Sequence, residues 1–203
     1  MDLRKKSVST VIKMKTIDLS HQLFNAMPTY PSDPELDIEC IKNINNNNTL
    51  LHRLSMGTHT GTHIDAPSHI LKNGKYLDEF NISDFMGKAV KVDLQTYKNV
   101  DIHELEFSGI IFDLNWSENF KNPNTFYGKK RPEIPLDFIE SLLNTNIKFF
   151  GCDLPSVDQS GSKKKIIHNA LLSNNILIYE SLANLVKVPR LSVFEFIGLP
   201  LRI

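Results

Sequence analysis

The chain has 203 residues, 41% of them hydrophobic, and its 23 basic and 23 acidic side chains give a formal net charge of zero. This length and apolar content suit one domain with a sizeable core. The balanced charge argues against a nucleic-acid partner and against binding to an anionic membrane surface, and it is compatible with self-association.

The basic N-terminal segment lacks the apolar stretch of a signal peptide, and no apolar run reaches the roughly 18 residues of a membrane span. We expect residues 1–15 to be a disordered tail, with Met1 or Met14 as the true start. Residues 16–203 are expected to form one domain in the cytoplasm. Cys40 and Cys152, the only cysteines, are expected to be buried, reduced thiols.

Short runs rich in Val, Ile and Phe, bounded by polar residues, Gly or Pro, predict β-strands. In chain order these runs are 16–19, 36–41, 50–56, 89–94, 109–114, 148–152, 176–179 and 191–197. Helices are predicted over 135–144 and 166–174, and the Asn run 45–48 indicates a loop tip between strands. Because strands outnumber helices, we expect a single β-rich mixed α/β domain and not a doubly wound fold with strict alternation.

The most informative stretch is 59–69, which reads His-Thr-Gly-Thr-His-Ile-Asp-Ala-Pro-Ser-His. Imidazole and carboxylate are the ligands that hold Zn²⁺ and similar divalent ions. The β-branched threonines, the glycine and the proline disfavour a helix here, so we expect a tight loop that continues from the strand at 50–56. In such a loop His59, His63 and Asp65 can converge on one cation.

Three further residues extend this candidate site. His69 follows the loop's proline and is placed to lie near the metal without binding it, where a neutral imidazole could carry a proton from water to a leaving group. A second ion would need more ligands, and His168 and Glu180 are the best candidates. Glu180 ends a buried-looking strand, where a carboxylate is costly unless it is paired or metal-bound. A capping or salt-bridged Glu180 is the ordinary alternative.

Residues 59–69 match, without a gap, the loop His-Thr-Gly-Thr-His-x-Asp-x-Pro-x-His of the cyclase-superfamily metal-dependent hydrolases. This family includes bacterial kynurenine formamidase (arylformamidase) and isatin hydrolase. The segment Gly-Cys-Asp-Leu-Pro-Ser-Val-Asp at 151–158 and the segment at 168–184 resemble its later motifs, and 17–20 and 28–33 resemble its start. The chain therefore resembles this family over most of 16–203.

The resemblance implies a β-rich α/β fold of the swivelling β/β/α type that assembles as a homodimer or homotetramer, with the partner subunit helping to close the pocket. It also implies a two-metal site, with zinc favoured and manganese possible. In that site His59, His63 and Asp65 would hold the first ion. Asp65 would bridge to a second ion held by His168 and Glu180, and His69 would be the general acid/base.

Three positions depart from the family pattern. Position 32 is Ser where Gly is frequent, Tyr30 stands where formamidases tend to have Trp, and Asn115-Trp116 replaces a Thr-Gly-Trp type sequence. We expect Tyr30 and Trp116 to contact the substrate, so these departures concern the substrate and not the hydrolytic core.

The resemblance implies a cytoplasmic hydrolase of tryptophan-catabolism type that cleaves the C–N bond of a small amide, such as the aryl formamide N-formylkynurenine. An isatin-type cyclic amide or a carbamate is equally compatible with the motifs. Two rivals from other classes stay open at this point. One is a metal-binding relative without turnover, and the other is a structural domain whose histidines merely cap loops.

Overall fold

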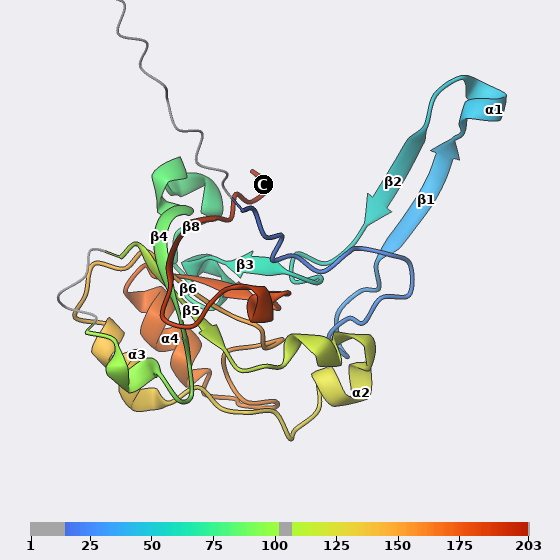
Figure 1. Cartoon of the computed structure of the whole chain (residues 1–203). Helices are drawn as coiled ribbons and strands as arrows, with labels where there is room; N and C mark the ends of the chain where they lie inside the picture. The colour runs from blue at the N-terminus through green and yellow to red at the C-terminus, as the bar shows by residue number, and fades with distance from the viewer. Residues whose placement is uncertain (1–14, 102–106, 203) are drawn as a thin grey trace, which may run out of the picture.

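The computed structural model describes residues 15–101 and 107–202, and its centre is a six-stranded mixed sheet (Figure 1). In chain order the strands of this sheet are β3 (His63–Asp65), β4 (Met86–Asp93), β5 (Gly109–Asp113), β6 (Phe149–Cys152), β7 (Leu177–Glu180) and β8 (Val193–Ile197). Across the sheet they follow the order β3-β7-β6-β5-β4-β8.

The four central strands, β4 to β7, pair in parallel, whereas β3 and β8 pair antiparallel at the two edges. Both faces of the central strands are covered, which explains why β5 and β6 are almost continuously apolar in sequence. The prediction of a β-rich mixed α/β fold is thus confirmed.

Two apolar layers cover the sheet. On one face, α3 (Leu136–Leu142) and α4 (Ile166–Ser173) pack against alternating strand residues that include Ile110 and Phe112. On the other face, Ile111, Phe149 and Leu177 pack against the segments near both ends of the sheet. The alternation within β5 follows from the two-residue period of a strand. Both predicted helices are present, each slightly shorter than expected.

A two-stranded arm projects from the body of the molecule (Figure 1). It consists of β1 (Asp37–Lys42) and β2 (Leu51–Ser55). The Asn run lies at its tip between the two strands, as predicted, but forms the short helix α1 (Ile44–Asn47) where a loop was expected. The expectation of two buried thiols is half wrong, because Cys40 lies exposed on this arm, while Cys152 is buried in β6 and both are free. Antiparallel pairing within the hairpin leaves both of its faces uncovered.

Other differences from the sequence prediction have local causes. Segment 16–19 is not a strand. The Leu19 carbonyl accepts the Ala183 amide at 2.7 Å and the Asp18 carbonyl accepts the Asn184 side-chain amide at 2.8 Å, but these two bonds do not form a strand ladder. Strand β8 begins two residues late, because Leu191 adopts a left-handed backbone with φ 52°. The tail expected over 1–15 falls almost wholly on residues 1–14, which lie outside the described residues.

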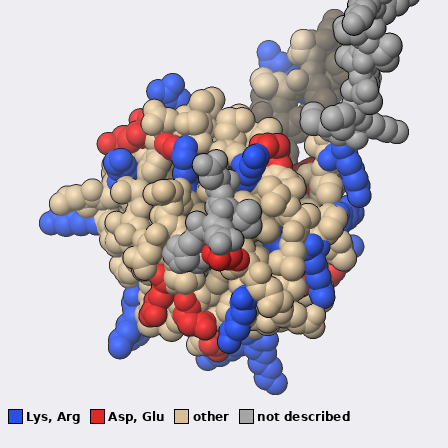
Figure 2. Space-filling view, turned by 60° about the vertical axis from the view of Figure 1, so that its left-hand side comes forward, with Lys and Arg blue, Asp and Glu red and all other residues tan. Residues whose placement is uncertain are grey.

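The remaining described elements are short: the helix α2 (Pro123–Phe126) and 3₁₀ turns at Pro67–His69, Leu77–Glu79, Ile82–Asp84, Tyr97–Asn99, Ser117–Lys121 and Leu185–Lys187. None of the described helices is long and apolar enough to cross a membrane. On the face shown in Figure 2, basic and acidic side chains are interspersed. This mixture agrees with the net charge of zero.

Candidate metal centre

The edge strand β3 sets the position of the first candidate ligands. It pairs antiparallel with β7, so that His63 lies directly opposite Glu180 and Asp65 opposite Ile178. His63 and Asp65 are two residues apart and share one face of the strand. As a result His63 Nε2 lies 3.5 Å from both Glu180 Oε2 and Asp65 Oδ1. The sequence prediction of a continuous loop missed this strand.

The turn before β3 fixes the His63 imidazole. Gly61 adopts φ +64°, a left-handed conformation that glycine tolerates without strain. The Gly61 carbonyl lies 2.9 Å from His63 Nδ1, and because a carbonyl only accepts, Nδ1 carries the proton. The Nε2 lone pair therefore faces the cluster, as in a metal-ligating histidine whose other nitrogen is hydrogen-bonded. Thr62 Oγ1 ties the turn to the end of β7 by donating to the Ser181 carbonyl at 2.5 Å.

His59 and His69 complete the loop's contribution from either side of β3. His59 Nδ1 lies 2.8 Å from Asp65 Oδ1, and the His59 and His69 rings are 4.2 Å apart between centroids. His69 ends the 3₁₀ turn Pro67–His69. Ligand atoms of His59, Asp65 and His69 all lie within 4.8 Å of one another. The same holds for His63, Asp65 and Glu180, so the two sets share Asp65.

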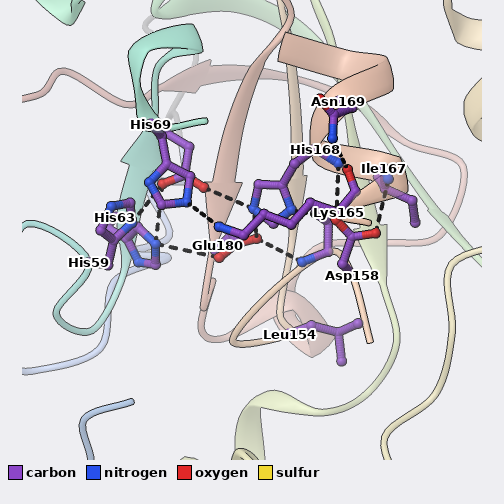
Figure 3. A network of polar contacts seen from close by, with 12 residues as sticks. His59, His63, His69, Leu154, Asp158, Lys165, Ile167, His168, Asn169 and Glu180 are labelled. Carbon is purple, nitrogen blue, oxygen red and sulfur yellow. Dashed lines mark hydrogen bonds and ion pairs between the residues drawn. The ribbon is translucent and has the colours of Figure 1, made fainter. Parts of the chain in front are cut away.

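Helix α4 brings His168 to the cluster from more than a hundred residues away. Its Nε2 lies 3.3 Å from Asp65 Oδ2 and 3.4 Å from Glu180 Oε1 (Figure 3). Its Nδ1 lies 2.7 Å from Asp158 Oδ2. The Asp158 carboxylate also accepts the backbone amides of Ile167 and His168, so one side chain both caps the helix and orients the imidazole.

This donor set fits divalent ions. Both carboxylate oxygens of Asp65 and the Nε2 atom of His63 are buried without an aligned hydrogen bond to any described residue, although imidazoles approach within ion-pair distance. Buried polar atoms in proteins are normally satisfied, and unsatisfied ones call for an explanation such as a missing ion. A metal among these nitrogen and oxygen atoms would supply the absent partner.

The electrostatics of the cluster agree with that fit. Burial alone would lower the pKa of His63, but Glu180 and Asp65 outweigh it and raise this pKa to about 9. Burial likewise opposes the charged form of His168, yet Asp158, Asp65 and Glu180 raise its pKa to about 10. Because the Asp65 and Glu180 carboxylates are buried and negatively charged, a positive charge between the imidazoles stabilises the cluster. Divalent cations would supply that charge in place of the protons.

His69 differs from the other histidines of the cluster. Partial desolvation at the rim of the cluster, where the His69 side chain still reaches solvent, is the main cause that lowers its pKa to about 4. His59, Lys165 and His168 lower it further against the charge of Asp65. The imidazole is therefore neutral at physiological pH and able to accept a proton. Because His69 also lies within ligating reach of Asp65 and His59, its assignment as a proton carrier and not a ligand stays a prediction.

The two residues expected to contact substrate lie in an aromatic region. Tyr30 packs edge-on against Tyr127 with ring centroids 5.7 Å apart. The Trp116 indole N–H donates to the Phe126 carbonyl at 3.1 Å, which holds the ring in place. Within the described part of the chain, the hydrogen bonds and ring contacts of these two residues do not reach the histidine cluster, and their role toward substrate stays a prediction.

Sequence reasoning assigned no role to Asp158 or Asp153. Asp158 could have been found, because metal-ligating histidines commonly donate their second nitrogen to a carboxylate, and a Ser-Val-Asp run precedes His168 by ten residues. The buried Asp153 carboxylate accepts the backbone amides of Leu114, Trp116 and Ser117 at 2.9, 2.5 and 3.1 Å. Asp153 thereby fixes the turn that presents Trp116, a role that no spacing in the sequence indicates.

Comparison with known proteins agrees with this architecture. The family model described as "Putative cyclase" matches residues 17–159. A kynurenine formamidase of Bacillus mycoides is 31% identical over 178 residues, covering 83% of each chain. One of Salinibacter ruber is 30% identical over 196 residues, covering 94% of this chain and 92% of the relative.

Among solved structures, isatin hydrolase A from Labrenzia aggregata, bound to benzyl benzoate, superposes with a TM-score of 0.78 at 22% identity, covering 92% of this chain and 87% of that one. A predicted metal-dependent hydrolase from Bacillus stearothermophilus gives a TM-score of 0.63 at 24% identity, covering 86% and 84%. These two likenesses establish the fold. Fold and site together define a metal-dependent hydrolase, and the chain belongs to the cyclase family.

The contact between Asp158 and His168 predicts a measurable effect on metal binding. We expect Asp158→Asn to weaken metal affinity by roughly 10- to 100-fold, because the ring loses the carboxylate that orients it. Competition with a chromophoric chelator measures this affinity. Asp78→Asn, at an exposed carboxylate in a surface turn, is the matched control and should bind metal like the parent. Equal affinity in the two variants would contradict the assignment.

Proposed function

We propose that the chain is a two-metal amidohydrolase that cleaves small aryl formamides, with His69 as its general acid/base. The observation that carries the proposal is the convergence of four imidazoles and the Glu180 carboxylate around Asp65, whose own carboxylate oxygens lack aligned partners. By the family resemblance, His59, His63 and Asp65 would hold one ion, and Asp65, His168 and Glu180 the other. In the structure, the ligand atoms of His63 lie with those of Asp65 and Glu180, and those of His59 with Asp65 and His69, so Asp65 is the shared ligand in either grouping. Bound divalent ions would polarise the amide carbonyl and make water more acidic.

The protein's own residues would handle the protons. His69, neutral because burial lowers its pKa, would take a proton from the attacking water as the water oxygen bonds to the carbonyl carbon. It would then deliver that proton to the amide nitrogen as the C–N bond breaks, releasing a carboxylic acid and an amine. The Gly61 and Asp158 contacts would keep His63 and His168 oriented throughout. Loss of the His69 base form should lower the rate as the pH falls.

The relatives support an aryl formamide over other amides. Proteins about 30% identical to this chain carry the name kynurenine formamidase, and they align over most of its length. The likeness to isatin hydrolases is one of fold, so a cyclic amide remains the second candidate substrate. The same proposal includes zinc as the metal, with manganese as the alternative. It also includes a cytoplasmic location, with Cys40 and Cys152 as reduced thiols.

A hydrolysis screen with a His69 variant tests this function. Metal-analysed protein should hydrolyse formanilides faster than isatins and carbamates. We expect His69→Asn to keep full metal occupancy and to lower kcat by on the order of 10²–10⁴, the usual contribution of a general acid/base. Loss of metal in this variant would make His69 a ligand. Full occupancy together with an unchanged rate would contradict the proposed mechanism.

We further propose that the chain is a homodimer or homotetramer in which the arm packs on a second copy. The arm exposes six apolar side chains, each between 41% and 62% exposed: Ile41, Ile44, Leu50, Leu51, Leu54 and Met56. An isolated two-stranded hairpin is marginally stable in water, and clustered exposed apolar groups mark interfaces. The loop that precedes the arm is tied to the arm's base, because the Asn25 side-chain amide donates to the Ile38 carbonyl and accepts from the Ile38 N–H.

Sedimentation at micromolar concentration tests the assembly. We expect a dimer or larger species, with an interface that buries more than roughly 1,200 Å² in total. A Leu51→Lys, Leu54→Lys variant should shift the protein toward monomer by placing charges in that interface. Ile82→Lys, which changes an exposed residue on the body, is the matched control. A monomeric parent would refute the proposal.

A further inference from the structure

Lys165 brings a positive charge to the edge of the histidine cluster, and the sequence analysis gave it no role. Its Nζ lies 3.2 Å from His69 Nε2, and Figure 3 shows its side chain reaching across the cluster from α4 toward His69. A His69 ring nitrogen in turn lies within 4.8 Å of an Asp65 carboxylate oxygen. The ammonium is therefore next to the candidate metal ligands, where the amide would react.

The backbone holds Lys165 in this position. Lys165 adopts a left-handed conformation with φ 42° and ψ 55°, which is strained for a non-glycine residue and persists only when neighbours enforce it. Asn169 enforces it, because its side-chain amide donates to the carbonyls of Lys164 and Lys165 at 3.0 and 2.8 Å. Lys163 and Lys164 of the same run are exposed, whereas Lys165 is half-buried.

The ammonium keeps hydrogen-bonding capacity for a ligand. A lysine carries three donors, and within residues 15–101 and 107–202 its recorded polar contact is the one with His69. No carboxylate of the described residues forms an ion pair with it. A half-buried cation with unused donors, beside the candidate metal ligands, is suited to an anionic group on the ligand.

We propose that Lys165 is a specificity-determining residue that binds a carboxylate carried by the amide substrate close to the scissile bond. The inference rests on the proposed function and narrows its substrate class from aryl formamides in general to those with an anionic substituent near the formamide. A carboxylate ortho to the formamide nitrogen meets this requirement, since it lies a few bonds from the carbonyl that reacts. The ammonium would donate to that carboxylate and to His69 together.

Two matched substrates test the proposal. Formanilide and 2-formamidobenzoate share the scissile bond and differ by the ortho carboxylate. The measured quantity is the ratio of their kcat/KM values, because any effect of Lys165 that acts through His69 is common to both substrates and cancels. A charge-assisted hydrogen bond contributes about 1.5–3 kcal/mol, so Lys165→Met should lower the ratio by roughly 10- to 100-fold. Lys165→Glu should lower it further by repulsion.

Lys164→Met is the matched control, because it removes an exposed lysine from the adjacent position and should leave the ratio unchanged. An equal ratio in the parent and in Lys165→Met would overturn the proposal and leave Lys165 as a residue that only holds His69. An equal fall in both variants would also overturn it, since the effect would then reflect the net charge of the loop.

A binding measurement separates this proposal from the proposed function. The product pair, 2-aminobenzoate and aniline, can be titrated calorimetrically into metal-analysed protein without any turnover. The parent should bind 2-aminobenzoate more tightly than aniline, and Lys165→Met should lose that difference. If neither formanilide is hydrolysed, the proposed function fails while the titration still decides the role of Lys165. Equal affinity of the parent for both amines would overturn the specificity proposal alone.

Discussion

The pairing of three residues of β3 with the end of β7 is the constraint on which the rest of the site depends. It places His63 opposite Glu180 and sets Asp65 on the same face two residues later. A shift of one residue in this register would turn both ligands to the opposite face of the sheet. The glycine turn before β3 and the Thr62 contact with Ser181 hold that register at the edge, where a three-residue strand has few hydrogen bonds of its own.

The buried charged groups of the site destabilise the folded protein, and a bound metal ion would offset that cost. Asp65, Glu180 and His168 are almost completely buried, and the pKa of Asp65 is held far below its ordinary value because neighbouring imidazoles outweigh the cost of burial. Removing one member of such a cluster leaves an uncompensated buried charge. The surrounding core, with the parallel strands covered on both faces, provides a rigid frame for these groups.

Much of this could be predicted from the sequence, and the failures have physical reasons. The apolar runs of β4 to β7 and the helical periods of α3 and α4 are local patterns, so they were predicted within a few residues. The residue types in 59–69 and their spacing were enough to predict which side chains could bind a metal. Strand β3 was missed because only the middle one of its three residues is apolar, and it acquires strand structure only by pairing with β7. Lys165 was missed because a run of three lysines usually indicates a solvated surface, and only the backbone conformation at 165 turns one of them inward.

The central claim is that Asp65 is shared by two divalent ions. Metal analysis after equilibrium dialysis against zinc, on the parent and on Asp65→Ala, tests it most directly. The account predicts two ions per chain for the parent and neither for Asp65→Ala, with the variant still folded by far-ultraviolet circular dichroism. A folded Asp65→Ala protein that retains one ion, or a parent that binds only one, would contradict the shared centre.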